Sequence, residues 1–106
     1  MNRELIDRQV ENARIRLRDV EDQMSSPKNV ANQRRMIELG REHRRLSRIL
    51  KLSRTLTQLE SQLESSLAVL EEEEEEEILE LARTEIAELE PQVEYAENSL
   101  QVALLP

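Results

Sequence analysis

The 106-residue chain has no cysteine, tryptophan or phenylalanine, and it contains a single tyrosine, a single histidine and a single glycine. Without cysteine there is no disulfide framework, no thiolate nucleophile and no cysteine-based zinc site. One glycine cannot supply a glycine-rich phosphate loop, and the lack of aromatic residues and turn glycines argues against a β-sandwich or barrel. These absences exclude most enzyme classes, and we expect no catalytic residue, no cofactor and no metal site.

Long apolar runs are also missing. The N-terminal residues alternate between charged and apolar types, so they predict neither a signal peptide nor a membrane span. Leu, Glu, Arg, Ala and Gln are abundant, which is typical of long helices. We therefore expect a soluble, cytoplasmic, all-α protein.

Apolar residues repeat at alternating steps of three and four, which predicts helices with a narrow apolar seam over residues 2–24, 29–70 and 75–103. The first predicted seam contains Ile6, Val10, Ala13, Leu17, Val20 and Met24. The second contains Met36, Leu39, His43, Leu46 and Leu50, and then Leu52, Leu56, Leu59, Leu63, Leu67 and Leu70. The third contains Leu79, Ala82, Ile86, Leu89, Val93, Ala96, Leu100 and Ala103.

Two interruptions separate the predicted helices. Ser26 precedes Pro27 and is pushed away from helical geometry, and the seven glutamates Glu71–Glu77 repel one another at helical spacing and predict a turn. Pro91 lies within the third seam, where we expect a kink and not a break. The helix lengths predict a single domain over residues 1–106: an elongated three-helix, antiparallel, coiled-coil-like monomer in which both outer helices share the long middle one.

Charge is divided unevenly along the chain. Residues 1–54 contain 14 Lys/Arg and 8 Asp/Glu, a net of +6, whereas residues 55–106 contain 1 and 15, a net of −14. Either the two halves neutralise each other across helices, or they face different partners.

Arginines crowd the first part of the predicted middle helix. Their spacing places several on one face, as expected for a surface that contacts phosphates. The candidate contact residues are Arg34, Arg41, Arg44, Arg45 and Arg48. Without interleaved aromatic residues, contact with the nucleic-acid backbone is expected and base stacking is not. The alternative interpretation is an ordinary arginine-rich coiled-coil surface.

Several stretches resemble the N-terminal helical domain of bacterial class I peptide chain release factors. Leu17–Val20 followed by Ser25–Lys28 resembles the end of that domain's first helix and the loop after it. Leu39–Leu46 is similar to the family pattern L-S-K/R-E-Y-x-x-L, with Gly40 and His43 in place of the usual Ser and Tyr. Glu80–Ile86 resembles E-L/M-A-x-E/D-E-L/I, and Leu100–Pro106 resembles L-x-x-L-L-L-P, with which the family's first domain ends.

The resemblance implies a domain that docks near the base of the ribosomal stalk, at the GTPase-associated centre, and contacts ribosomal protein and rRNA. The family's Gly-Gly-Gln loop and its codon-reading loop are not in this chain, so we expect no peptide release and no stop-codon reading from it. The implied partner is the ribosome, with no DNA and no membrane. Two alternatives remain: a generic coiled-coil scaffold, which would self-associate, and a stand-alone regulatory or rescue protein that uses the same helical domain.

Overall fold

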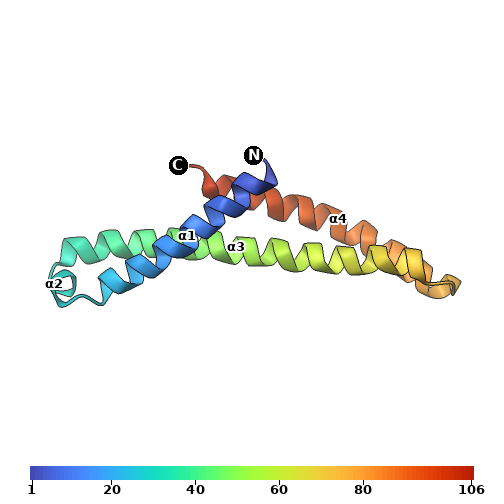
Figure 1. Cartoon of the computed structure of the whole chain (residues 1–106), viewed down its shortest axis with the longest axis horizontal. Helices are drawn as coiled ribbons and strands as arrows, with labels where there is room; N and C mark the ends of the chain where they lie inside the picture. Colours follow the sequence, from blue (N-terminus) through green and yellow to red (C-terminus); the bar gives the residue numbers. More distant parts are fainter. The chain divides into compact units, whose positions relative to one another are not determined.

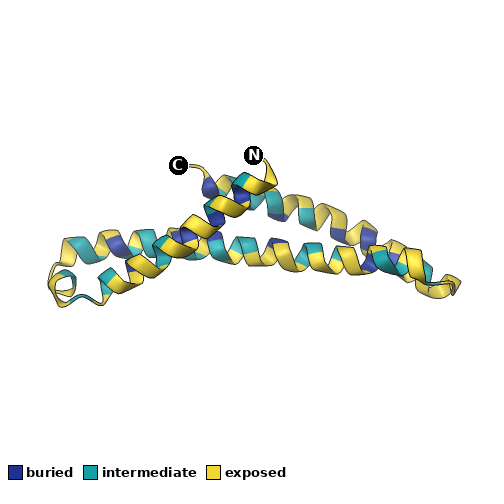
Figure 2. Cartoon of the chain, in the orientation of Figure 1, coloured by how far each residue is buried: buried dark blue, intermediate teal, exposed yellow.

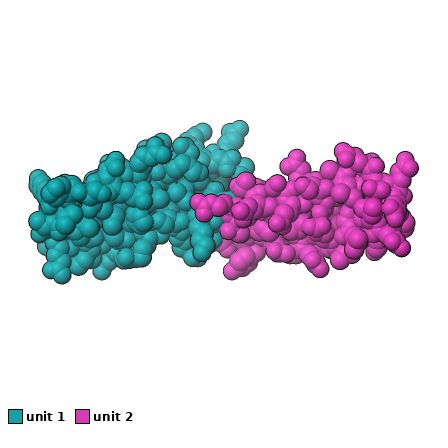
Figure 3. Space-filling view, turned by 90° about the horizontal axis from the view of Figure 1, so that it is seen from below, with its two compact units in different colours: residues 1–53, 100–106 teal, residues 54–99 magenta.

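The computed structural model describes residues 1–106 and contains four helices and no strand. They are α1 (Arg3–Met24), α2 (Pro27–Val30), α3 (Gln33–Glu72) and α4 (Glu76–Leu104), shown in Figure 1. This confirms the all-α fold and the long middle helix. The chain forms two compact units, residues 1–53 with 100–106 (unit 1) and residues 54–99 (unit 2), so α3 contributes to both (Figure 3). None of the helices has an apolar stretch of the length that crossing a bilayer requires.

Unit 1 is held by the apolar seams of α1 and of the first part of α3, together with the last turn of α4. Its buried side chains are Ile6, Val10, Ala13, Val20, Leu39, Leu46, Ile49, Leu100 and Leu104, which form the dark stripes of Figure 2. Four of the six predicted seam residues of α1 are therefore confirmed as buried, whereas Leu17 and Met24 are partly exposed. In α3 the buried residue after Leu46 is Ile49, three positions on, while Leu50 remains partly exposed.

The connection between α1 and α3 differs from the prediction. The chain forms the single-turn helix α2 at Pro27, and α3 begins at Gln33 instead of residue 29. Proline fits the first position of a helix, because its fixed φ suits helical geometry and no hydrogen bond is needed from its nitrogen there. The side chain of Asn32 then accepts a hydrogen bond from the backbone N–H of Arg35 at 3.0 Å, which caps the start of α3.

Unit 2 is a helical hairpin in which the last part of α3 runs antiparallel to α4 (Figure 1). Its buried apolar residues are Leu56, Ala82, Ile86, Leu89 and Ala96. The prediction that Leu67 and Leu70 lie in the seam is wrong, since both are exposed and Ser66 is buried instead. A seam that faces a partner helix advances by 3.5 residues on average, so two successive steps of four, from Leu59 to Leu63 to Leu67, turn Leu67 away from α4. A step of three from Leu63 leads to Ser66, which keeps the seam facing α4.

The predicted turn lies within the glutamate run, at residues 73–75. The carboxylate of Glu73 accepts hydrogen bonds from the backbone N–H groups of Glu74 and Glu75, both at 3.2 Å. Glu76 and Glu77 occupy the first turn of α4, where negative charge is favourable near the exposed N–H groups. Beyond the turn, α4 continues through Pro91 without a break.

Candidate phosphate-contacting surface

A row of solvent-exposed arginines lies on α3 within unit 1. The five predicted residues, Arg34, Arg41, Arg44, Arg45 and Arg48, are all exposed, and we call them the arginine face. Four of them follow steps of seven, four and three, which keeps them on one side of the helix. The buried residues Leu39 and Leu46 point elsewhere, towards the core of unit 1.

No ion pair within the protein neutralises the arginine face. Residues 33–54 contain eight Lys/Arg but only two acidic residues, Glu38 and Glu42. Both carboxylates are bound by other arginines: Glu38 by Arg35, and Glu42 by Arg16 of α1. The guanidinium groups of the arginine face are therefore available to an external anion.

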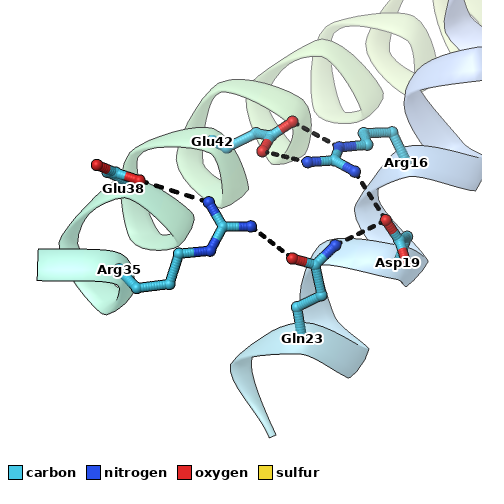
Figure 4. Close-up of polar contacts among 6 residues, drawn as sticks. All are labelled: Arg16, Asp19, Gln23, Arg35, Glu38 and Glu42. Atoms are coloured by element: carbon cyan, nitrogen blue, oxygen red, sulfur yellow. Dashed lines mark hydrogen bonds and ion pairs between the residues drawn. The ribbon is translucent and has the colours of Figure 1, made fainter. Parts of the chain in front are cut away.

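The paired charges form a network between α1 and α3, drawn in Figure 4. Arg16 donates two parallel hydrogen bonds to the carboxylate of Glu42, from Nε to Oε2 at 2.7 Å and from Nη2 to Oε1 at 2.8 Å. A third nitrogen of Arg16 donates to Asp19 at 2.7 Å, and Gln23 donates to the same carboxylate oxygen at 2.9 Å. The amide oxygen of Gln23 accepts a 2.6 Å bond from Arg35, so the network joins the two helices through side chains alone.

The network shifts the ionisation of its strongest pair. The hydrogen bonds from Arg16 lower the pKa of the Glu42 carboxyl below its ordinary value, although partial burial opposes the effect. In the same way the hydrogen bond to Glu42 raises the pKa of Arg16. Glu42 therefore stays ionised and stays bound to Arg16 at neutral pH.

His43, predicted in the seam, lies half-buried at its edge and makes polar contacts. Its Nε2 lies 3.3 Å from a carboxylate oxygen of Glu21, and its Nδ1 lies 3.5 Å from the hydroxyl of Ser47. The order Ser–His–Glu resembles a hydrolytic triad, but the backbone amides around Ser47 are committed to α3 and cannot form an oxyanion hole. We therefore assign His43 the role of linking α1 to α3. No group of three or more acidic or histidine side chains is arranged to hold a metal ion.

Sequence reasoning missed two features of this surface. Lys51 is exposed one heptad after Arg44 and extends the positive row, and its spacing from Arg44 was a usable signal. Arg16 of the first helix, which the sequence analysis does not single out, binds Glu42 across the helix pair. Nothing in the local sequence identifies that pairing, because the partners are 26 residues apart.

Together these features define an all-helical domain with a row of exposed arginines on α3. A family model, the PCRF domain, matches residues 13–106, which include the whole arginine face. The chain belongs to the PCRF-domain family.

Curated relatives agree with this assignment. Peptide chain release factor 1 of Syntrophobacter fumaroxidans is 35% identical over 97 residues, and that of Treponema denticola is 32% identical over 97 residues. The protein of the same name from Akkermansia muciniphila is 34% identical over 97 residues. Each match spans 92% of this chain but only 27% of the relative. The chain is thus similar to the N-terminal domain of type 1 release factors. No solved structure gives a significant match.

Proposed function

We propose that residues 1–106 act as one helical docking domain of a translation termination factor, and that the arginine face contacts ribosomal RNA at the base of the ribosomal stalk. Five exposed arginines of α3 in a PCRF domain, four of them on one side of the helix and none of them in an ion pair, carry this proposal. Guanidinium groups bind phosphate oxygens through paired hydrogen bonds, and they remain charged at any physiological pH.

The proposed contact is with the sugar–phosphate backbone and the shape of the RNA. No aromatic side chain lies on the arginine face, because the single aromatic residue is Tyr95 on α4. The binding free energy would come mainly from release of counterions as phosphates are neutralised. Binding of this kind weakens steeply as salt rises.

Co-sedimentation of the chain with ribosomes at low and raised salt tests the proposal. Replacement of Arg41, Arg45 and Arg48 by glutamine removes three positive charges from the face. We expect weaker association with ribosomes. In a plot of the logarithm of the association constant against the logarithm of the salt concentration, the slope should be flatter by about 2–3, if each arginine neutralises about one phosphate. Circular dichroism should show an unchanged helical fold, because all three side chains are exposed.

A control variant distinguishes binding through the arginine face from general attraction by positive charge. Replacement of Arg8, Arg14 and Arg18 by glutamine removes the same charge from exposed positions on α1. Near-normal ribosome association of this control supports the arginine face. An equal loss of association in both variants would contradict a specific docking face, and normal association of the α3 variant would exclude the face altogether.

The resemblance supports further parts of the proposal. The chain spans about a quarter of the length of the relatives it matches, and we propose that reading the stop codon and hydrolysing peptidyl-tRNA belong to parts of those proteins that it does not cover. We propose a cytoplasmic monomer with ribosomal protein and rRNA as partners. Sedimentation velocity tests this against the scaffold alternative, because a scaffold assembled through its seams would sediment as an oligomer.

A further inference from the structure

A groove with polar walls and an apolar floor lies within unit 1, between α1, α3 and the last turn of α4. It has a volume of about 270 Å³, near the lower end of the range that is usual for small-molecule sites, about 300–1,000 Å³. Its floor consists of side chains that are buried in the core of unit 1: Ala13, Leu46, Ile49 and Leu104. A single flat ring system suits a groove of this size and floor.

The α1 wall of the groove contains two side-chain amides without a partner. Gln9, Asn12 and Arg16 follow steps of three and four, so they lie in one row along α1. The amides of Gln9 and Asn12 form no hydrogen bond with the rest of the chain. Each therefore keeps a donor N–H and an acceptor carbonyl for a ligand, and this is the pair of groups that matches N7 and N6 of adenine.

Arg16 adds a flat and fixed surface to the same wall. Its Nε and Nη2 donate hydrogen bonds to Glu42 and its Nη1 donates one to Asp19, as Figure 4 shows. Because these bonds lie in the plane of the guanidinium group and engage all its nitrogens, the face of the plane is what a ligand can use. Unstacked bases of RNA stack on arginine planes as they do on aromatic rings. The scarcity of aromatic residues, from which we expect no base stacking, therefore does not exclude it at this groove.

Arg45 connects the groove to the arginine face. It lines the groove, it is exposed, and it forms no ion pair. A ligand that occupies both places needs an anionic group a short distance from a flat ring. A nucleotide has this composition, which favours it over an uncharged ring or an isolated phosphate.

We propose that this groove binds one unstacked adenine of RNA. The ring would lie against the face of Arg16, its N6 and N7 would bond the amide of Asn12 or Gln9, and its phosphate would contact Arg45. The inference rests on the proposed function and adds recognition of a base to a contact with the RNA backbone. A base within a duplex is stacked and paired, so the RNA recognised here would be a loop or a bulge.

Fluorescence anisotropy with the whole chain and synthetic RNA strands of equal length tests the proposal. One strand is a ribose–phosphate chain without bases except for a single central adenine, the second has a central uracil instead, and the third has no base. All three carry the same number of phosphates, so the backbone contributes equally to their binding. We expect the adenine strand to bind at least about fivefold more tightly than the other two.

Variants of the amides test which residues read the base. Gln9→Ala combined with Asn12→Ala should reduce the preference for adenine to less than about twofold, without changing the affinity for the strand that has no base. Alanine is the better helix former, so the fold should be retained, which circular dichroism checks. The matched control Asn98→Ala removes an exposed amide from α4 in unit 2 and should keep the full preference.

A second control addresses the phosphate contact separately. Arg41 and Arg48 belong to the arginine face but do not line the groove. Their combined replacement by glutamine should weaken binding of all three strands by the same factor and leave the preference for adenine unchanged.

The outcomes separate this site from the proposed function. Equal affinity for the three strands, a preference for uracil, or a preference for adenine that persists in the amide variant would each overturn the adenine site and leave the backbone contact in place. Absence of binding to every strand would also overturn the adenine site, and co-sedimentation with ribosomes would then decide the proposed function alone. A preference for adenine in a chain whose ribosome association does not respond to the arginine replacements would support the adenine site and contradict the proposed docking face.

Discussion

Leu56 and Leu67 have the same chemistry on the same helix of unit 2, but the structure assigns them opposite environments. Leu56 is 1% exposed and Leu67 is 46% exposed. Truncation of a buried leucine to alanine loses the free energy of transferring the removed atoms out of water, and it leaves a cavity. The free energy of unfolding generally falls by about 2–5 kcal/mol, and by about 2–3 kcal/mol where a narrow seam can partly collapse around the cavity. We expect Leu56→Ala to lower the free energy of unfolding by about 2–3 kcal/mol, and Leu67→Ala to lower it by less than about 1 kcal/mol.

Urea unfolding followed by far-ultraviolet circular dichroism measures both variants. In a domain of this size, a loss of 2–3 kcal/mol corresponds to a fall in Tm of about 10–20 °C. The dependence on urea should keep its slope, which would show that the variants change stability and not the surface exposed on unfolding. Equal losses in both variants would refute the seam of unit 2 described above, and would restore the pattern in which Leu67 faces α4.

Three further changes test individual contacts. Gly40→Ala should stabilise the chain by about 0.5–1 kcal/mol in thermal unfolding, because an added Cβ meets only the end of Arg44 at 3.6 Å; destabilisation would mean that another segment packs against Gly40. Asn2→Ala removes the side-chain cap that accepts a 2.9 Å hydrogen bond from the backbone N–H of Leu5, and should cost about 1 kcal/mol. Because Arg16 lowers the pKa of Glu42 in the folded state, the pair stabilises the fold above the carboxyl's unfolded pKa of about 4.3 and loses that contribution as pH falls through the folded pKa. The small stability difference that we expect between the parent and Glu42→Gln should therefore vanish in acid, and a difference that persists at low pH would contradict the assignment.

The sequence was sufficient for the three long helices and for most of their buried residues, but not for the single-turn helix α2. In α1 and α4 the alternating steps of three and four are regular, and the predicted residues Ile6, Val20 and Leu100 are indeed buried. Hydrophobic periodicity succeeds here because a helix buries one stripe and exposes the rest. The turn among the glutamates was also predictable, since mutual repulsion disfavours a helix through all seven.

The prediction of buried residues in the last part of α3 was wrong because it followed the leucines. Leu67 and Leu70 suggested a continuing seam, and no apolar residue marks the true position at Ser66. Which residues of α3 are buried depends on the position of the partner helix as well as on the sequence of α3. The partner helix α4 contributes the small Ala82 and the larger Ile86 to the buried seam of unit 2. Side-chain pairing across helices was likewise beyond the sequence, because contacts such as that of Arg16 with Glu42 depend on which helix faces are brought together.

The net charge of −8 does not argue against an RNA-binding surface, because the charge is divided between the units. Unit 1 contains 13 Lys/Arg and 8 Asp/Glu, a net of +5, whereas unit 2 has a net of −13. At physiological ionic strength charges act over about 8 Å, so a phosphate at the arginine face responds to the nearby guanidinium groups and not to the total. The two carboxylates closest in sequence to the arginine face are already in ion pairs, Glu38 with Arg35 and Glu42 with Arg16. The network in Figure 4 thus does two things: it joins α1 to α3, and it removes the carboxylates that would otherwise pair with the arginine face. Because Arg16→Gln frees the carboxylate of Glu42 to pair with the arginine face, this variant should weaken ribosome association more than Arg18→Gln, although both remove one charge from α1.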